Sequence, residues 1–164
     1  MSGTKSSLLT KSSLLIVDDD NSVRTALSCL FTEIGYSVRT AEDGLSALAA
    51  MRKEIPNILL SDLNMPGMSG FELLSVVRCR FPAIQTVAMS GSFRGSEVPP
   101  GVAADRFYEK GSNLAPLLSI IEALPQMERR GAQSSRRRGV FIDSSERRGS
   151  FHWSACRDRV PRAS

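Results

Sequence analysis

Two short apolar runs in this sequence each end in aspartate. Leu14–Val17 leads into Asp18–Asp20, and Ile58–Ser61 leads into Asp62. Apolar runs of this length, bounded by polar or turn-forming residues, are typical of buried strands. Parallel strands deliver their carboxyl ends to one edge of a sheet, where such sheets bind ligands, so we expect both groups of acids to meet there. Clustered carboxylates at that edge predict a site for a hard cation such as Mg²⁺ beside a nucleophilic aspartate.

The first 124 residues alternate between strand-like and helix-like patterns. We expect strands at 14–17, 36–40, 58–61, 84–89 and 107–109. We expect helices at 21–34, 44–55, 70–81 and 114–124, capped in turn by Asp20 or Asn21, Asp43, Ser69 and Asn113. Residues 90–101 are harder to assign, because two glycines and Pro99–Pro100 interrupt any long helix. Five strands alternating with about five helices predict an α/β fold, a doubly wound five-stranded parallel sheet flanked by helices.

The charge of the chain divides near Pro125. Residues 1–124 carry 11 Lys and Arg against 13 Asp and Glu, whereas residues 125–164 carry 10 Arg against 4 acids. We expect a flexible N-terminal segment at 1–11, one folded domain at 12–124 and a largely disordered, basic Arg/Ser-rich tail at 125–164. Arginine clusters near aromatic residues allow nucleic-acid binding by this tail. We favour a solvated tail without a specific ligand.

Composition also bears on where the protein resides. No apolar run approaches the roughly 18–20 residues that span a bilayer, and the N-terminus lacks the apolar core of a signal peptide. Cys29 and Cys79 lie in helix-like stretches, where we expect them to pack as small, reduced, apolar side chains. These features predict a cytoplasmic protein without a membrane anchor.

Several short motifs follow the predicted strands in order. They are Asp18-Asp19 after the first strand, Asp62 with Met65-Pro66-x-x-x-Gly70 after the third, Ser90 after the fourth and Lys110 after the fifth. With this set of motifs, residues 12–124 resemble the receiver domain of bacterial two-component response regulators. The resemblance implies a flavodoxin-like fold, as in the chemotaxis receivers.

The resemblance implies phosphoryl chemistry at the aspartates. Asp62 is expected to accept a phosphoryl group and to form an acyl phosphate. The reaction is expected to depend on Mg²⁺ held by Asp18, Asp19, Asp62 and the backbone carbonyl of Asn64. The implied donor is a sensor histidine kinase or a phosphotransfer protein. Because His152 is the only histidine in the chain, we expect the donor to be a separate molecule.

The resemblance also implies a switch. Ser90 and Lys110 are expected to contact the phosphoryl oxygens. Ser90 and Phe107 are expected to change position on phosphorylation and thereby alter the binding of a downstream protein, which the sequence does not identify.

Two departures from the family pattern leave other functions open. Gly111 stands where receivers usually have a proline, and Pro99–Pro100 lies where their fourth helix usually runs. We therefore expect a looser loop after Lys110 and a shortened or distorted signalling face. We favour a stand-alone receiver controlled by phosphorylation. The first alternative is a degenerate receiver that binds its partners constitutively.

The second alternative is an enzyme, a phosphatase of the haloacid-dehalogenase type. Its Asp-x-Asp signature would be satisfied by Asp18 and Asp20. A receiver depends on Asp62, whereas such a phosphatase would depend on Asp18. The phosphatase alternative leaves the strand-end Asp62 and the Pro/Gly-containing loop after it unexplained.

Overall fold

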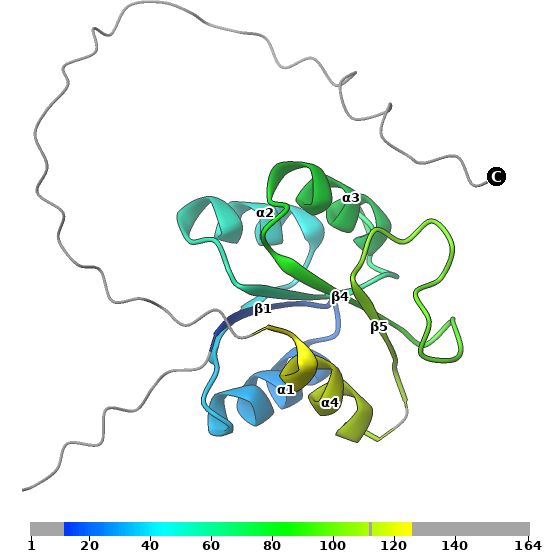
Figure 1. The fold of residues 1–164 in the computed structure, drawn as a ribbon. Coiled ribbons are helices and arrows are strands. Elements are labelled where there is room, and N and C mark those ends of the chain that lie inside the picture. Colours follow the sequence, from blue (N-terminus) through cyan, green and yellow to red (C-terminus); the bar gives the residue numbers. More distant parts are fainter. Residues whose placement is uncertain (1–11, 112, 126–164) are drawn as a thin grey trace, which may run out of the picture. The chain divides into compact units, whose positions relative to one another are not determined.

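The computed structural model describes residues 12–111 and 113–125 (Figure 1). Five parallel strands form one sheet in the order β2-β1-β3-β4-β5. The strands are β1 (Ser13–Val17), β2 (Ser37–Ala41), β3 (Ile58–Asp62), β4 (Gln85–Ser90) and β5 (Arg106–Glu109). The predicted doubly wound parallel sheet is confirmed, and each predicted strand boundary lies within one residue of the observed one.

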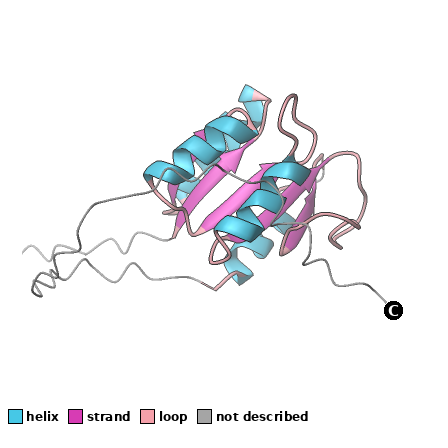
Figure 2. Ribbon diagram, turned by 90° about the horizontal axis from the view of Figure 1, so that it is seen from above, coloured by secondary structure: helices cyan, strands magenta, loops and turns pink. Residues whose placement is uncertain are grey.

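Helices pack on both faces of this sheet. They are α1 (Asn21–Glu33), α2 (Gly44–Lys53), α3 (Gly70–Arg80) and α4 (Ala115–Ala123). Helices α1 and α4 cover one face, and α2 and α3 cover the other (Figure 1). The view in Figure 2 shows the strands running side by side between these two helical layers.

Most helices begin where the sequence places a capping side chain. Asp20 accepts hydrogen bonds from two backbone N–H groups in the first turn of α1, and Asp43 and Ser69 form capping boxes at the starts of α2 and α3. At α4 the N-cap position is Leu114, one residue later than predicted. Asn113 still contributes, because its Oδ1 accepts a hydrogen bond from the N–H of the first helical residue at 2.6 Å.

Strands β1 and β3 are buried on both faces, and this burial positions the aspartates. Every residue of β1 and β3 is buried. Alternate side chains enter different apolar clusters: Leu15 packs with α2 and α3, and Ile16 packs with α1 and α4. The two strands are neighbours, with Val17 paired to Ser61. The aspartates that follow them therefore reach the same point at the carboxyl edge of the sheet.

The connection between β4 and β5 departs from the alternating pattern. The sequence predicted about five helices, but the described residues form four, and none lies between Ser90 and Arg106. Gly95 and Gly101 take positive φ angles of 96° and 82°, a conformation that does not continue a right-handed helix. Where the sequence analysis expected a shortened or distorted signalling face, the structure has an irregular segment. We call residues 91–105 the β4–β5 segment.

The prediction that Cys29 and Cys79 pack in the core is wrong, because both are exposed. In α1 the buried positions are Leu27 and Phe31, and in α3 the last buried position is Val77. Each cysteine lies two residues from a buried position. Residues with this spacing do not share a helix face, so each cysteine points away from the sheet.

Two of the predictions fall on residues that the structure does not describe. These are the flexible N-terminal segment at 1–11 and, apart from Pro125, the disordered basic tail at 125–164. Both stay predictions, together with the preference for a tail that has no nucleic-acid ligand. Among the residues that are described, no helix has the length and apolar character needed to cross a membrane.

Candidate functional site

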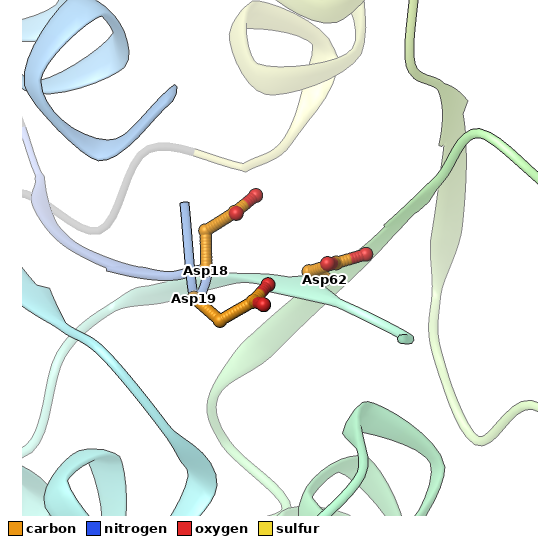
Figure 3. A group of neighbouring side chains, drawn as sticks. All are labelled: Asp18, Asp19 and Asp62. Atoms are coloured by element: carbon orange, nitrogen blue, oxygen red, sulfur yellow. The ribbon is translucent and has the colours of Figure 1, made fainter. Parts of the chain in front are cut away.

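Three aspartates meet at the carboxyl edge of the sheet. Asp18 and Asp19 follow β1 and Asp62 ends β3, and Figure 3 shows their side chains at the adjacent ends of these strands. One carboxylate oxygen from each aspartate lies within 4.8 Å of the other two. Asp18 is fully buried and Asp62 is 5% exposed, whereas Asp19 is open to solvent. The acidic cluster predicted from the two apolar runs is therefore present.

Lys110 reaches this cluster from the loop after β5. Its Nζ lies 2.6 Å from Asp18 Oδ2 and 3.1 Å from Asp62 Oδ2. Burial alone lowers the pKa of Lys110, but hydrogen bonds to the two aspartates and their charges outweigh burial, so the pKa lies above its usual value. The ammonium group is therefore charged at neutral pH and compensates part of the negative charge of the cluster.

Burial raises the pKa of the Asp62 carboxyl, and this effect outweighs the hydrogen bond and the charge of Lys110. The backbone N–H of Asn64, which donates to Asp62 Oδ1 at 3.3 Å, also acts against the increase, whereas the charge of Asp18 adds to it. The ionised form of Asp62 is therefore held at a cost in the folded protein. This is expected where two buried carboxylates share one ammonium group.

The donor set fits a divalent cation. Among the described residues, the ion pairs of this cluster join Lys110 to Asp18 and Asp62. Three carboxylates thus lie beside one ammonium group, so negative charge remains in excess. Asp18 Oδ2 is buried and accepts no hydrogen bond beyond its contact with the Lys110 ammonium group. Carboxylate oxygens with few protein donors are the ligands that Mg²⁺ prefers. Asp18, Asp19 and Asp62 are thus suited to hold Mg²⁺, and the Asn64 carbonyl stays a predicted ligand.

Ser90 is linked to the loop after Asp62 by Asn64. The Ser90 Oγ accepts hydrogen bonds from Asn64 Nδ2 at 3.0 Å and from the backbone N–H of Ser92 at 3.1 Å. Asn64 Nδ2 also donates to Ser92 Oγ at 3.1 Å. A hydroxyl that accepts two hydrogen bonds keeps its single O–H available as a donor. The sequence analysis did not predict the link between Asn64 and Ser90, because positions at strand ends do not fix the direction of the side chains.

Phe107 lies inside the structure, on β5, and is 1% exposed. Its ring meets that of Phe93 edge-on, with centroids 6.5 Å apart, and Phe93 in turn meets Phe71 of α3 at 6.2 Å. Phe93 belongs to the β4–β5 segment, so this irregular segment contributes a ring that packs on Phe107. Sequence reasoning missed Phe93 because an irregular segment has no hydrophobic period.

Gly70 allows the start of α3 to pack directly on the end of β3. A Cβ atom at this position would lie 1.9 Å from the carbonyl oxygen of Asp62 and 2.7 Å from Leu63 Cα. The Gly70 N–H donates to the Leu63 carbonyl at 3.1 Å. The Met-Pro-x-x-x-Gly spacing after Asp62 therefore has a steric cause, because only glycine allows the helix to approach the site so closely.

Gly111 takes a conformation that proline cannot adopt. Its φ angle is 89°, whereas the ring of proline holds φ near about −65°. The loop after β5 thus differs from one that carries proline at this position. Lys110 nevertheless reaches both aspartates, and its backbone N–H donates to the Ser90 carbonyl at 2.9 Å. The glycine therefore does not prevent assembly of the site.

The raised pKa of Asp62 predicts a pH-dependent difference between the wild type and an Asp62→Asn variant. The folded protein keeps the Asp62 proton to a higher pH than the unfolded chain, whose value is near 3.8. The contribution of Asp62 to the free energy of unfolding therefore falls as pH rises from 3.8 through the raised pKa. We expect the variant to gain stability relative to the wild type across this window, and the difference to level off above it.

Urea unfolding of both proteins in a metal chelator, at a series of pH values, measures this difference. Titration of carboxyl groups remote from Asp62 cancels when the two free energies of unfolding are subtracted. A difference that stays constant with pH, or that favours the wild type as pH rises, would contradict the assigned direction of the pKa shift.

Comparison with known proteins points to one family. The model of the response regulator receiver domain matches residues 14–120. The DNA-binding transcriptional regulator NtrC of Salmonella typhimurium is 34% identical over 116 residues, which cover 70% of this chain and 24% of NtrC. The chemotaxis response regulator CheY4 of Vibrio cholerae is 31% identical, with a TM-score of 0.61 over 69% of this chain and 98% of CheY4.

A third similar protein has been solved with ligands. The response regulator TrrA of Thermotoga maritima is 26% identical, with a TM-score of 0.62 over 68% of this chain and 96% of TrrA. It was solved in complex with Mg²⁺ and BeF, and separately with the histidine kinase ThkA. The chain spans about a quarter of the length of the NtrC proteins that it matches, but nearly the whole length of CheY4 and TrrA.

Proposed function

The chain belongs to the response regulator receiver domain family, and from this premise we propose that Asp62 accepts a phosphoryl group in a Mg²⁺-dependent reaction. The observation that carries the proposal is the position of Asp62, beside Asp18 and Asp19 and within 3.1 Å of Lys110. Such a group has a nucleophile, a place for a divalent cation and a fixed positive charge. These are the parts that phosphoryl transfer needs.

In the proposed reaction, a carboxylate oxygen of Asp62 attacks the phosphorus atom of the donor. A bond forms between that oxygen and phosphorus, the bond from phosphorus to the leaving group breaks, and its electron pair leaves with the donor. The product is an acyl phosphate on Asp62. Bound Mg²⁺ supplies neutralising charge for the phosphoryl oxygens and for the ligand carboxylates.

Lys110 and Ser90 are proposed to bind the transferred group. The Lys110 ammonium group, which lies between Asp18 and Asp62, is placed to exchange its contact with Asp62 for one with a phosphoryl oxygen. The Ser90 hydroxyl has its donor proton available, because Asn64 and Ser92 already occupy it as an acceptor. Each side chain would then move toward the new group.

The β4–β5 segment is proposed to transmit this movement. Ser90 precedes the segment. Phe93, within the segment, packs on Phe107 of β5. Glu109 of β5 accepts hydrogen bonds from Arg94 and from the backbone N–H of Gly95, which also belong to the segment. A shift of Ser90 toward the phosphoryl group would therefore disturb the packing around Phe107. The β4–β5 segment would then have two packings, one of which presents a surface that binds a downstream protein. Phosphorylation would change the populations of these two packings.

A histidine kinase or a phosphotransfer protein is the proposed donor. The complex of TrrA with the kinase ThkA supports a partner of this kind. The proposal concerns the receiver module and holds whether or not an output domain is attached to it. The stand-alone interpretation and the domain limits at 12–124 therefore stay predictions, as does the cytoplasmic location.

The two alternatives have less support. The family match accounts for Asp62 and the loop after it, which a phosphatase of the haloacid-dehalogenase type leaves unexplained. Asp20, the second acid of the Asp-x-Asp signature, is engaged as the helix cap of α1. A degenerate receiver is disfavoured because Lys110 meets both aspartates despite the substitution at Gly111.

The test is the intact mass of the full chain after incubation with acetyl phosphate, with Mg²⁺ or with a chelator. We expect the wild type to gain one phosphoryl group only when Mg²⁺ is present, and the Asp62→Asn variant to gain none. Asp20→Asn is the matched control, because asparagine also caps helices, so labelling should continue. If folded wild type gains nothing from acetyl phosphate or from a phosphorylated phosphotransfer protein, the degenerate receiver replaces this proposal.

A further inference from the structure

Arg24 lies in the first turn of α1, where a positive side chain is unfavourable. The N-terminal end of a helix carries a partial positive charge, so acidic side chains are stabilising there and basic ones are not. The acidic side chain at this end of α1 is the N-cap Asp20, which already accepts hydrogen bonds from two backbone N–H groups of the first turn. The stability of the helix therefore does not explain an arginine at this position. Its contacts lie instead with the loop that precedes the helix.

The Arg24 guanidinium joins two successive carbonyl groups of the aspartate loop. Its Nη1 donates to the backbone carbonyl of Asp18 at 2.6 Å and to that of Asp19 at 3.0 Å. Its Nη2 donates to Asn21 Oδ1 at 3.2 Å, within the same helical turn. A guanidinium presents its N–H groups in a rigid plane, and hydrogen bonds from a charged donor are strong. One side chain of α1 thus anchors the backbone of both aspartates.

The Asp19 carboxylate depends on this backbone for its position. The Asp18 carboxylate has contacts of its own, because Oδ1 accepts a hydrogen bond from the Asp20 N–H at 3.0 Å and Oδ2 meets Lys110. Asp19 is exposed. Among the described residues, the side chain that hydrogen-bonds to Asp19 is that of Arg24, which donates to the Asp19 backbone carbonyl. Its carboxylate nevertheless lies within 4.8 Å of the other two. The loop backbone, rather than side-chain contacts, therefore sets where this carboxylate lies.

We propose that Arg24 is a positioning residue for the divalent-cation site, which holds the loop backbone so that the Asp19 carboxylate lies beside Asp18 and Asp62. The inference rests on the proposed function, because it takes these aspartates as cation ligands. It goes beyond that function by assigning a determinant of cation affinity to a residue that is not a ligand.

Geometry and charge predict opposite effects of removing Arg24. Loss of a positive charge near the site reduces repulsion and would strengthen the binding of Mg²⁺. Loss of the anchor frees the loop and weakens binding. The Arg24 side chain is half-buried, so solvent screens part of its repulsion. Groups that hold a metal ligand in place typically contribute about 10–100-fold to metal affinity. The anchor should therefore dominate.

The experiment measures Mg²⁺ affinity of the full chain by isothermal titration calorimetry, with Arg24→Gln and Arg24→Lys beside the wild type. We expect both variants to bind Mg²⁺ about tenfold more weakly. Lysine keeps the charge, but it has no second nitrogen to donate to Asn21 while the first holds the two carbonyls. Arg52→Gln is the matched control, since it removes an exposed arginine from α2, and its affinity should equal that of the wild type. Thermal unfolding in a chelator shows that each variant is folded.

Each other outcome overturns the inference. If Arg24→Gln binds Mg²⁺ as tightly as the wild type or more tightly, the residue acts through charge or not at all. If Arg24→Lys keeps wild-type affinity, a positive charge suffices and the anchor is not needed. If the wild type binds no Mg²⁺, or if Asp62→Asn binds it as tightly as the wild type, the cation site itself is wrong. Failure of the proposed function is distinguishable, because it leaves Mg²⁺ binding intact while the intact mass shows no phosphoryl gain.

Discussion

Replacement of Gly70 by alanine is expected to lower the free energy of unfolding by about 3 kcal/mol or more. The added Cβ would lie 1.9 Å from the Asp62 carbonyl oxygen and 2.8 Å from the Asp62 carbonyl carbon. Both are backbone atoms of a buried strand end, so no side-chain rotation relieves the overlap. Either α3 moves away from the sheet or the end of β3 moves, and both loosen the core beneath this helix.

The same substitution should also abolish phosphoryl acceptance. Asp62 ends β3, and a shift of its carbonyl displaces the carboxylate relative to Asp18 and Lys110. We expect thermal unfolding to begin more than about 10 °C lower than in the wild type. We also expect no gain in mass from acetyl phosphate at a temperature where the variant is still folded, which circular dichroism establishes.

Gly91→Ala is the matched control for this prediction. A Cβ on Gly91 would meet Lys110 Cβ at 4.0 Å, which is an ordinary contact, although this glycine also lies at the site. The free energy of unfolding of the Gly91→Ala variant should stay close to that of the wild type. Equal stability of the Gly70→Ala and Gly91→Ala variants would show that the close approach of α3 to β3 does not constrain Gly70.

The parts of the site that the sequence predicts are those that stand at strand ends. Asp18 and Asp62 each follow a short apolar run and Lys110 follows the predicted fifth strand, and the parallel sheet brings the ends of these strands to one edge. The position of these residues along the chain is therefore enough to predict that they meet. The capping residues Asp43 and Ser69 were predicted for a similar reason, since a cap acts within one helical turn.

The parts that the sequence does not predict depend on side-chain direction. Cys29 and Cys79 were assigned to the core from apolar neighbours, but they are out of phase with the buried positions of their helices. Phe93 and Arg24 act on residues outside their own elements, through a ring contact and through hydrogen bonds to a preceding loop. Arg24 did leave a signal, because a basic residue in the first turn of a helix is unfavourable unless it serves another purpose.

Lys110→Met should destabilise the metal-free protein and strengthen its binding of Mg²⁺. Asp18 is fully buried, and loss of the ammonium group leaves its charge without a partner next to that of Asp62. Breaking a buried ion pair costs about 3–5 kcal/mol, and we expect the lower end because the Lys110 side chain is 23% exposed. The ammonium group also repels a cation that would bind the same oxygens, so its loss should raise Mg²⁺ affinity at least about tenfold.

Urea unfolding in a chelator and in saturating Mg²⁺ separates these two effects. Because a ligand of the folded state adds stability in proportion to the logarithm of its affinity, Mg²⁺ should stabilise the variant more than it stabilises the wild type. Lys53→Met, which removes an exposed lysine of α2, is the matched control and should change neither quantity measurably. A variant that Mg²⁺ stabilises less than the wild type would show that Lys110 assists cation binding. The ammonium group would then not compete with the cation for Asp18 and Asp62.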